Sequence, residues 1–307
     1  MPDRVSHATG GTRAWSAEGS FRRAAVRRAA WLLALSLNAT ACSVVSPSSA
    51  APKARTPTVA ARHSPRSSAT GSPSSSSHRT SRPLAGKIVG IDPGHNGLNH
   101  TAPAFLAKQI WNGREWEDCN TTGTQTASGY TEALFNFNVA TYLAADLRKD
   151  GARVVLTRHN NHGLGPCVNR RSAMLNHTDV AIDIHADGGP AWGRGFTVLE
   201  PVADGPNDNV IAPSVRFGHD VHKAFLAGTP MRVSDYYGHD GYIFRDDLAG
   251  LNLTTVPKVL IECGNMPNAA DAALLTTPRV QRRIARALEA AIIRFLTGRW
   301  QPGRRSG

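Results

Sequence analysis

Acidic residues are scarce at the start of this 307-residue chain, where only Asp3 and Glu18 precede residue 86 against twelve lysines and arginines. Ten of the twelve net positive charges of the whole chain therefore lie in its first 85 residues. The rest of the chain is nearly neutral, with 23 basic and 21 acidic side chains. With 41% hydrophobic residues overall, the chain has enough apolar material for one substantial folded domain, which excludes a wholly disordered protein.

A hydrophobic run long enough to span a bilayer is also missing. The apolar run at 29–42 (AAWLLALSLNATAC) has fewer than the roughly 20 residues that a transmembrane helix needs. Two arginine pairs at 22–23 and 27–28 precede it and small residues end it, which is the layout of a secretory signal peptide. We therefore expect 1–42 to direct export to the periplasm or cell wall, by the general or the twin-arginine route. Export also argues against a nucleic-acid partner for the basic segment.

Cys42 follows the small residues Ala39, Thr40 and Ala41, as in a lipoprotein cleavage box. Position 39 departs from that box because it is Ala where a larger aliphatic residue is usual. Cys42 is thus a candidate lipid-attachment site, and such an anchor is the one membrane contact that the sequence suggests.

Large apolar residues are nearly absent between Val45 and Pro83, where Ser, Pro, Ala and Thr dominate. Such a segment buries too little surface to offset the entropy lost on ordering, so we expect 43–85 to be a disordered basic tether. The prediction then places one folded domain at 86–298 and a flexible tail at 299–307.

Within 86–298, segments with strand character alternate with segments of helical periodicity. Apolar stripes at spacings of three and four predict helices at 131–147, 170–176, 213–226 and 278–296. Short apolar runs predict strands at 87–92, 153–157, 180–185, 195–199 and 257–263. This alternation predicts an α/β fold, a single domain with a mixed, mostly parallel sheet flanked by helices on both faces.

Three of the predicted strands run directly into polar groups at their carboxyl ends. The first ends at His95, the second at His185 and the third at Glu262. In open α/β sheets these ends meet at one rim, where ligands bind. Two imidazoles and one carboxylate supply three ligands to zinc and leave a fourth position for water. Spacing alone leaves open whether the third ligand is Glu132 or Glu262.

Four motifs in order resemble the zinc-dependent N-acetylmuramoyl-L-alanine amidases, the type 3 amidase family of cell-wall hydrolases. They are IDPGH at 91–95, Glu132 with Asn136, IDIHAD at 182–187 and LIECGNMPN at 260–268. The connecting residues LTR at 156–158, Arg171, Asn176 and Asp179 fit the same pattern. The resemblance covers essentially all of 86–297.

The resemblance implies one zinc ion per domain, with three protein ligands: His95, Glu132 and His185. It implies Glu262 as the catalytic carboxylate, which serves as the general base beside the metal. Asn136 lies one helical turn after Glu132 and is a candidate to orient it. Asp92 is a candidate to fix the geometry before the first histidine, or simply to cap the Pro-Gly turn.

The implied reaction is hydrolysis of the amide between N-acetylmuramic acid and L-alanine, in peptidoglycan or in soluble muropeptides, by a monomeric enzyme. One rival is a zinc peptidase that shortens wall stem peptides, because the same ligands suit both. The other is a non-catalytic peptidoglycan-binding protein, which would lack a ligand or Glu262, and neither is missing. The sequence does not distinguish polymer from fragment, nor does it give the stem-peptide preference or an activator.

The sequence departs from the family pattern at three places near the site. Asp183 stands where a small hydroxyl residue is usual, Cys263 where threonine or a small apolar residue is commoner, and GNMPN at 264–268 replaces the usual run after the catalytic carboxylate. These positions line the walls, so we expect them to affect substrate preference more than chemistry.

The chain has only four cysteines, and they lie in different kinds of segment. Cys119 and Cys167 lie in irregular segments, and an oxidising exterior favours a disulfide between them. Cys263, beside the catalytic strand, is expected to be a free buried thiol.

For several other residues, the sequence is compatible with either a role in substrate binding or a purely structural role. The aromatic residues of the insertion, Trp111, Trp116 and Tyr130, belong either to a hairpin that grips substrate or to a loop that covers the core. His219 and His222 are expected on a helix surface, and His239 in a loop, as a candidate for substrate contact. The sequence leaves open whether a segment of the chain blocks the cleft, and 202–213 is the place to look for one.

Overall fold

Six strands form one sheet in the computed structural model, which describes residues 82–299. Their order is β4 (Arg153–Leu156), β1 (Ile88–Pro93), β5 (Val180–Asp187), β8 (Lys258–Asn265), β6 (Thr197–Pro201) and β7 (Tyr242–Arg245). The predicted signal peptide, Cys42, nearly all of the predicted tether and nearly all of the tail lie outside the described residues. Among the described helices, none combines the length and apolarity that crossing a membrane requires.

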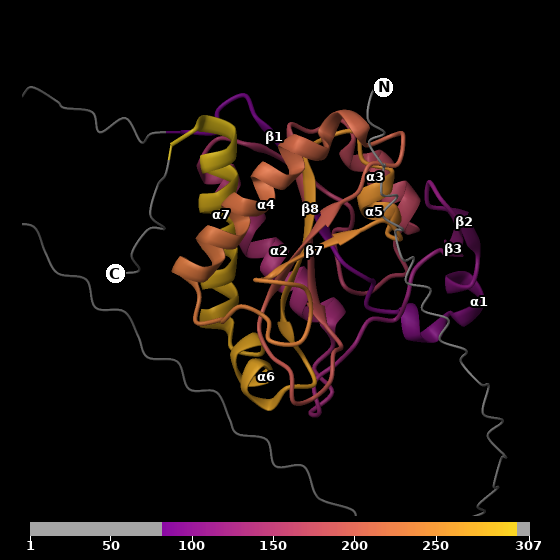
Figure 1. Cartoon of the computed structure of the whole chain (residues 1–307). Helices are drawn as coiled ribbons and strands as arrows, with labels where there is room; N and C mark the ends of the chain where they lie inside the picture. The colour runs from indigo at the N-terminus through magenta and orange to yellow at the C-terminus, as the bar shows by residue number, and fades with distance from the viewer. Residues whose placement is uncertain (1–81, 300–307) are drawn as a thin grey trace, which may run out of the picture. The chain divides into compact units, whose positions relative to one another are not determined.

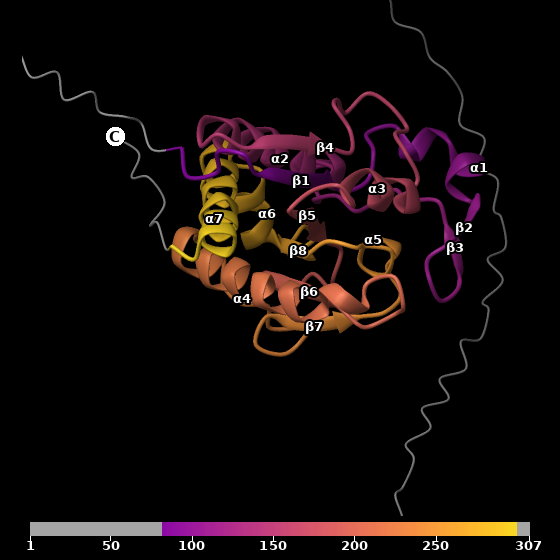
Figure 2. The same cartoon turned by 90° about the horizontal axis from the view of Figure 1, so that it is seen from above.

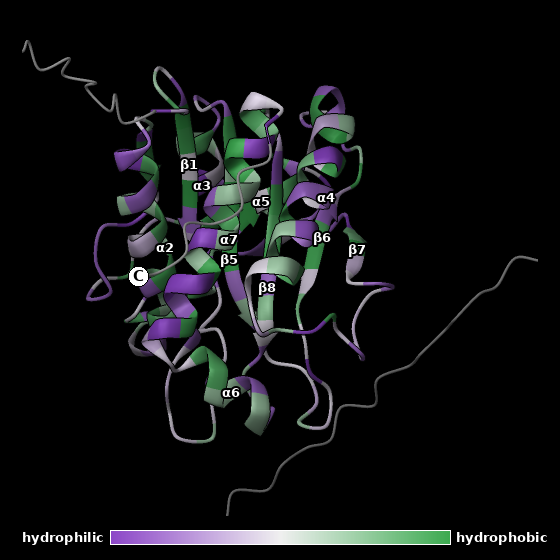
Figure 3. Ribbon diagram, turned by 90° about the vertical axis from the view of Figure 1, so that its left-hand side faces the viewer, coloured by the Kyte–Doolittle hydropathy of each residue, from purple (hydrophilic) through white to green (hydrophobic). Residues whose placement is uncertain are grey.

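The pairing of the strands confirms a mixed, mostly parallel sheet. β4, β1, β5 and β8 pair in parallel, β6 runs antiparallel to β8, and β7 runs parallel to β6. The central strands are buried along almost their whole length, as expected where helices cover both faces. In Figure 3 these strands are mostly green, and the helices turn many of their purple residues outward.

Helices cover both faces of the sheet, as predicted. Figure 2 shows α2 (Glu132–Lys149), α4 (Ile211–Gly228) and α7 (Pro278–Thr297) on one side. The other side carries α3 (Val168–Leu175) and α5 (Ala249–Asn252), which pack against each other. The short α6 (Ala269–Leu275) follows β8 (Figure 1).

The apolar faces of the long helices are buried at the positions that the sequence periodicity predicts. In α2, Phe135, Val139 and Leu143 follow one another at intervals of four and are fully buried. Thr131 precedes the helix and accepts a hydrogen bond from the Leu134 amide, which caps its first turn. α7 ends at Thr297 and is capped by Gly298, whose φ of 68° is the left-handed conformation that glycine adopts most readily.

Sequence patterns missed the smallest elements. They are the 3₁₀ turns Asn99–Thr101 and Asp208–Val210, α1 (Pro103–Leu106), α5, α6 and the edge strand β7. The predicted strand at 195–199 is displaced to 197–201, because Gly195 adopts a φ of 108° and the chain straightens only after it. The insertion forms the two-stranded hairpin β2 (Gln109–Trp111) and β3 (Trp116–Asp118).

A disulfide joins Cys119, just after the hairpin, to Cys167, at the start of α3, as predicted. Cys263 is free and buried, also as predicted. The disulfide therefore ties the insertion to the α3 side of the domain.

Removing this disulfide is expected to destabilise the domain. The two cysteines are 48 residues apart, and cross-links that close loops of this size contribute about 2–4 kcal/mol. The Cys119→Ser/Cys167→Ser double variant should lose that much free energy of unfolding in a urea titration. Reduced wild-type protein should then match the variant, and an unchanged midpoint in both would contradict the prediction.

Glu200 in β6 is a buried carboxyl group against α4. One of its oxygens has no hydrogen-bond partner within residues 82–299, and a Cβ at Gly218 of α4 would lie only 2.2 Å from it. Burial raises the pKa of Glu200 from 4.5 to about 7. Because ionisation is easier in the unfolded chain, the folded state loses stability as the pH rises through this window.

The Glu200→Gln variant is expected to be more stable than the wild type at pH 8, by about 2–3 kcal/mol, because glutamine never ionises. Below pH 4.5 both proteins carry a neutral side chain here and should unfold at similar urea concentrations. Urea titrations at pH 4.5, 6 and 8 measure the difference. A gap independent of pH would show that Glu200 does not titrate in this window.

Candidate active site

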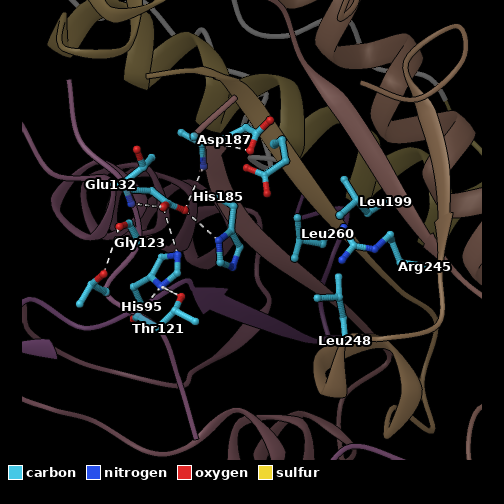
Figure 4. A pocket seen from close by; sticks show the side chains of 15 residues that line it. His95, Thr121, Gly123, Glu132, His185, Asp187, Leu199, Arg245, Leu248 and Leu260 are labelled. Carbon is cyan, nitrogen blue, oxygen red and sulfur yellow. Dashed lines mark hydrogen bonds and ion pairs between the residues drawn. The ribbon is translucent and has the colours of Figure 1, made fainter. Parts of the chain in front are cut away.

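Two histidines and a glutamate from three separate elements meet at one edge of the sheet. His95 follows β1, Glu132 is the first residue of α2 and His185 lies in β5. Their candidate ligand atoms all lie within 4.8 Å of one another. His95 Nε2 is 3.1 Å and His185 Nδ1 is 2.9 Å from opposite oxygens of the Glu132 carboxylate (Figure 4).

Hydrogen bonds behind these side chains fix their orientation. His95 Nδ1 lies 3.1 Å from the carbonyl oxygen of Thr121, which leaves Nε2 facing the cluster. Asn136 donates to Glu132 Oε1 (3.3 Å) and to the carbonyl of Gly94 (3.2 Å). The Thr124 amide donates to Glu132 Oε2 (3.0 Å). His95 and Glu132 are thus held from outside the cluster, and the His185 ring is held through its contact with Glu132.

Charges inside the cluster favour an ionised carboxylate between two imidazoles. Burial alone would raise the pKa of Glu132, but the two histidines outweigh it and hold that pKa well below its usual value. Burial would lower the pKa of His95, yet the adjacent Glu132 raises it. At His185 burial prevails and the pKa falls. One anion and two nitrogen donors make a donor set that suits a divalent transition metal.

Glu262 of β8 is the fourth functional side chain of the pocket. It is paired in register with His185. Its Oε2 is buried and has no hydrogen-bond partner among the described residues. Burial raises the pKa of Glu262 well above its usual value, and the Glu132 and Asp187 carboxylates raise it further. A buried acid without a fixed partner is suited to take up and release a proton.

The pocket that holds these groups encloses about 340 Å³, the size of a small-molecule site. The polar cluster occupies one side, with Thr121 and Gly123 near His95 (Figure 4). The other side is formed by three leucines and one arginine: Leu199, Leu248, Leu260 and Arg245. The pocket therefore has one end with a candidate metal site and one end with an apolar wall and a cation.

Arg245 is held in place by neighbours on the β7 side. Its guanidinium group makes two 2.6 Å hydrogen bonds to the Asp247 carboxylate and a third to the Tyr237 hydroxyl. Sequence patterns did not single out Arg245, because β7 itself is short and only partly buried.

Two buried arginines clamp the segment that presents His95. Arg158 donates to the carbonyls of Pro93 and Gly94 and, at 2.7 Å, to that of Ala133 in α2. Arg171 donates to Asp92 at 2.5 Å and to the carbonyl of His95 at 2.7 Å. His95 has a φ of 57°, a conformation that costs a residue other than glycine energy unless its surroundings impose it. The arginines impose it and connect His95 to the helix of Glu132.

Replacing Arg171 with methionine should cost about 3–5 kcal/mol of unfolding free energy, because Asp92 is left buried without its cation. Zinc affinity, measured by competition with a chromophoric chelator, should fall as well, since the His95 carbonyl loses its donor. The neighbouring Arg170→Met change, at an exposed position, is the matched control. If the two variants had the same unfolding free energy and the same zinc affinity, Arg171 would not hold the His95 segment in place.

The model of one protein family, described as N-acetylmuramoyl-L-alanine amidase, matches residues 89–294. The chain belongs to this amidase family. The amidase Rv3717 of Mycobacterium tuberculosis is 40% identical over 232 residues, which are 74% of this chain and 93% of that protein. The resemblance inferred from the motifs is therefore confirmed, and the family is one of hydrolases.

Solved structures of mycobacterial amidases confirm the fold. The amidase Ami1 of Mycobacterium smegmatis aligns with a TM-score of 0.66 at 39% identity, over 70% of this chain and 99% of its own. Ami1 of Mycobacterium abscessus gives a TM-score of 0.65 at 38% identity, over 69% of this chain and all of its own. Both alignments cover nearly the whole of the relatives' chains.

Within this amidase domain, the unusual Asp183 has a partner. Its carboxylate lies 2.9 Å from the Lys258 ammonium of the neighbouring strand, and both side chains are buried. Asp92 likewise lies beneath the cluster, where it accepts hydrogen bonds from Thr157 and Arg171, and it makes no hydrogen bond to the two histidines or Glu132. Both aspartates therefore belong to the support of the site.

The remaining candidates lie away from the pocket. His219 is exposed on α4 and His222 stacks on Tyr242, with ring centroids 4.5 Å apart. The His239 side chain is 94% exposed. The hairpin tryptophans and segment 202–213 contribute no residue to the lining of the amidase pocket, as far as the described residues show.

Proposed function

We propose that this chain hydrolyses the amide bond between N-acetylmuramic acid and L-alanine, in peptidoglycan or its fragments, with one zinc ion held by His95, Glu132 and His185. The observation that carries the proposal is the cluster of three ligands in one pocket with the unpaired Glu262 carboxyl group. Membership of the amidase family supports the substrate, since its relatives carry that activity in their names.

The donor set fits zinc on its own chemistry. Two imidazoles and one carboxylate are a common ligand set of hydrolytic zinc sites, which keep a fourth position open. The Thr121 carbonyl and Asn136 supply outer hydrogen bonds to two of these ligands, His95 and Glu132. When bound, zinc supplies a Lewis acid that polarises the substrate carbonyl and makes water a nucleophile near neutral pH.

The protein's own groups then handle the proton. Glu262 Oε2, free of any hydrogen bond in the described structure, accepts a proton from the attacking water and delivers it to the leaving nitrogen of L-alanine. Arg158 and Arg171 keep the His95 segment in place throughout.

The placement of the enzyme completes the proposal. Residues 1–42 export the chain and 43–85 tether the catalytic domain of 86–298, with Cys42 as the candidate site of lipid attachment. The enzyme acts as a monomer in the periplasm or cell wall.

Product identity tests the proposed reaction. The zinc-loaded chain is incubated with a muramoyl tripeptide and the products are identified by mass. The amidase releases intact N-acetylmuramic acid and a peptide that begins with L-alanine. A peptidase shortens the peptide and leaves L-alanine on the sugar, and that product would replace the proposal by the rival zinc peptidase. Binding without any product would favour a non-catalytic peptidoglycan-binding protein.

A further inference from the structure

Trp192 is the most exposed large hydrophobic side chain of the described residues, with 73% of its surface accessible. It lies in the segment 188–195, which begins directly after Asp187 at the end of β5. Asp187 and Gly188 line the amidase pocket. An exposed indole beside a catalytic pocket is unusual for a surface without a partner, since large apolar groups normally find cover.

The backbone around Trp192 is firmly anchored. Asn265 of β8 donates to the carbonyls of residues 190 and 193, at 2.8 and 2.7 Å. Asn268, which follows β8, donates to the carbonyl of residue 191 at 2.9 Å. Arg194 pairs with the buried Asp271. The indole is therefore presented from a fixed backbone, which lowers the entropic cost of binding.

Tyr236 connects this segment to the pocket. Its hydroxyl donates to Asp187 Oδ2 at 2.6 Å, and its ring meets the Trp192 ring edge to face, with centroids 6.5 Å apart. A Cβ at Gly193 would lie 2.5 Å from the Tyr236 ring, so the ring lies directly on the glycine backbone. The pocket rim, Tyr236 and Trp192 thus form one continuous surface, with the indole outside the pocket.

The charges of the pocket indicate which part of the substrate meets this surface. Arg245 is the only lysine or arginine in the described lining of the pocket, and it lies across the pocket from His95 and Glu132 (Figure 4). Beside the indole, the one cation of segment 188–195, Arg194, is already paired with the buried Asp271. The glycan is an uncharged chain of pyranose rings whose C–H faces match an aromatic face.

We propose that Trp192 stacks on a sugar ring of the glycan chain beyond the muramic acid whose amide is cleaved. This inference rests on the proposed amidase function, since the scissile amide fixes the muramic acid at the pocket. Because the indole lies outside the pocket, it contacts a neighbouring sugar, and a substrate with a single sugar does not reach it.

The test compares Trp192→Ala and Trp192→Phe with the wild-type chain on two substrates. One substrate is a muramoyl dipeptide with a single sugar, and the other is a peptide-bearing glycan of several disaccharides. Trp192→Ala should raise KM for the glycan about ten-fold, the scale of one lost aromatic contact. Its kcat/KM for the muramoyl dipeptide should be unchanged, and Trp192→Phe should stay close to wild type on both.

A binding assay separates this inference from the proposed reaction. Isothermal titration with a peptide-free oligosaccharide of the same sugars, whose lactyl carboxyl groups are capped as amides to keep it uncharged, should show about ten-fold weaker binding for Trp192→Ala. If the wild type cleaves neither substrate, the amidase proposal fails. The titration still tests whether Trp192 contributes to glycan binding. Unchanged KM and unchanged oligosaccharide binding in Trp192→Ala would overturn the inference. An equal loss on both substrates would also overturn it, because the single sugar does not reach the indole.

Discussion

The Glu262→Gln variant should retain zinc and lose about three orders of magnitude in kcat. Glutamine keeps the shape of the side chain but cannot accept or release a proton, and positioned acid–base groups contribute about 10²–10⁴-fold to such reactions. Glu262 has no other structural task visible among the described residues, because its Oε2 has no hydrogen-bond partner. The fold and the ligands should therefore be undisturbed.

The measurement is turnover of a muramoyl peptide together with the zinc content of the same sample. Glu115→Gln, a change of the same kind at an exposed position in the hairpin, is the control and should match the wild type. Wild-type turnover in Glu262→Gln would remove this residue from the mechanism. Loss of zinc together with turnover would instead make it a ligand.

The second large effect is expected from His185→Ala. His185 lies 2.9 Å from Glu132 within the three-residue cluster, so its loss leaves only two ligands. Zinc affinity should fall by more than the about 10–100-fold that loss of an outer hydrogen-bond partner costs. Activity should be undetectable at zinc concentrations that saturate the wild type.

His219→Ala is the matched control, because His219 is an exposed histidine on α4 away from the pocket. It should bind one zinc ion as tightly as the wild type. Equal zinc affinity in the two variants would contradict the assignment of the metal site. A circular dichroism spectrum of each variant shows that the domain is folded.

The buried strands and the long amphipathic helices are the parts of the fold that the sequence predicts well. The helices at 132–149 and 278–297 lie within about two residues of their predicted bounds, because their buried faces repeat over four or more turns. The edge strand β7 was missed, since only parts of its surface are buried and no alternating pattern marks it. The displacement of β6 follows from Gly195, whose conformation no pattern reveals.

The sequence placed the candidate ligands at one rim but left the third open between two glutamates. The structure puts the Glu132 carboxylate between the two histidines, because α2 begins at that residue and points it into the cluster. Glu262 stands beside the cluster without a hydrogen bond to it. Which glutamate becomes the third ligand depends on the distance in space between the start of α2 and the ends of the strands. The number of residues between them in the sequence does not give that distance.

The contacts of the buried charges that support the site were the part that the sequence did not predict. The family pattern includes Arg158 and Arg171 but does not reveal that both are buried and hold the backbone at Gly94 and His95. The ion pair of Asp183 and Lys258 is similar, since its partners are 75 positions apart and meet only across paired strands. Buried charges of this kind depend on long-range pairing, which a single sequence does not show.

The central claim is that one zinc ion in the His95–Glu132–His185 cluster is required for hydrolysis. Its most direct test removes metal from the wild-type chain with a chelator, removes the chelator and adds zinc stepwise while muramoyl peptide cleavage is followed. Activity should be absent at the start, rise linearly and stop rising at one equivalent of zinc. Full activity before any zinc is added would contradict the account.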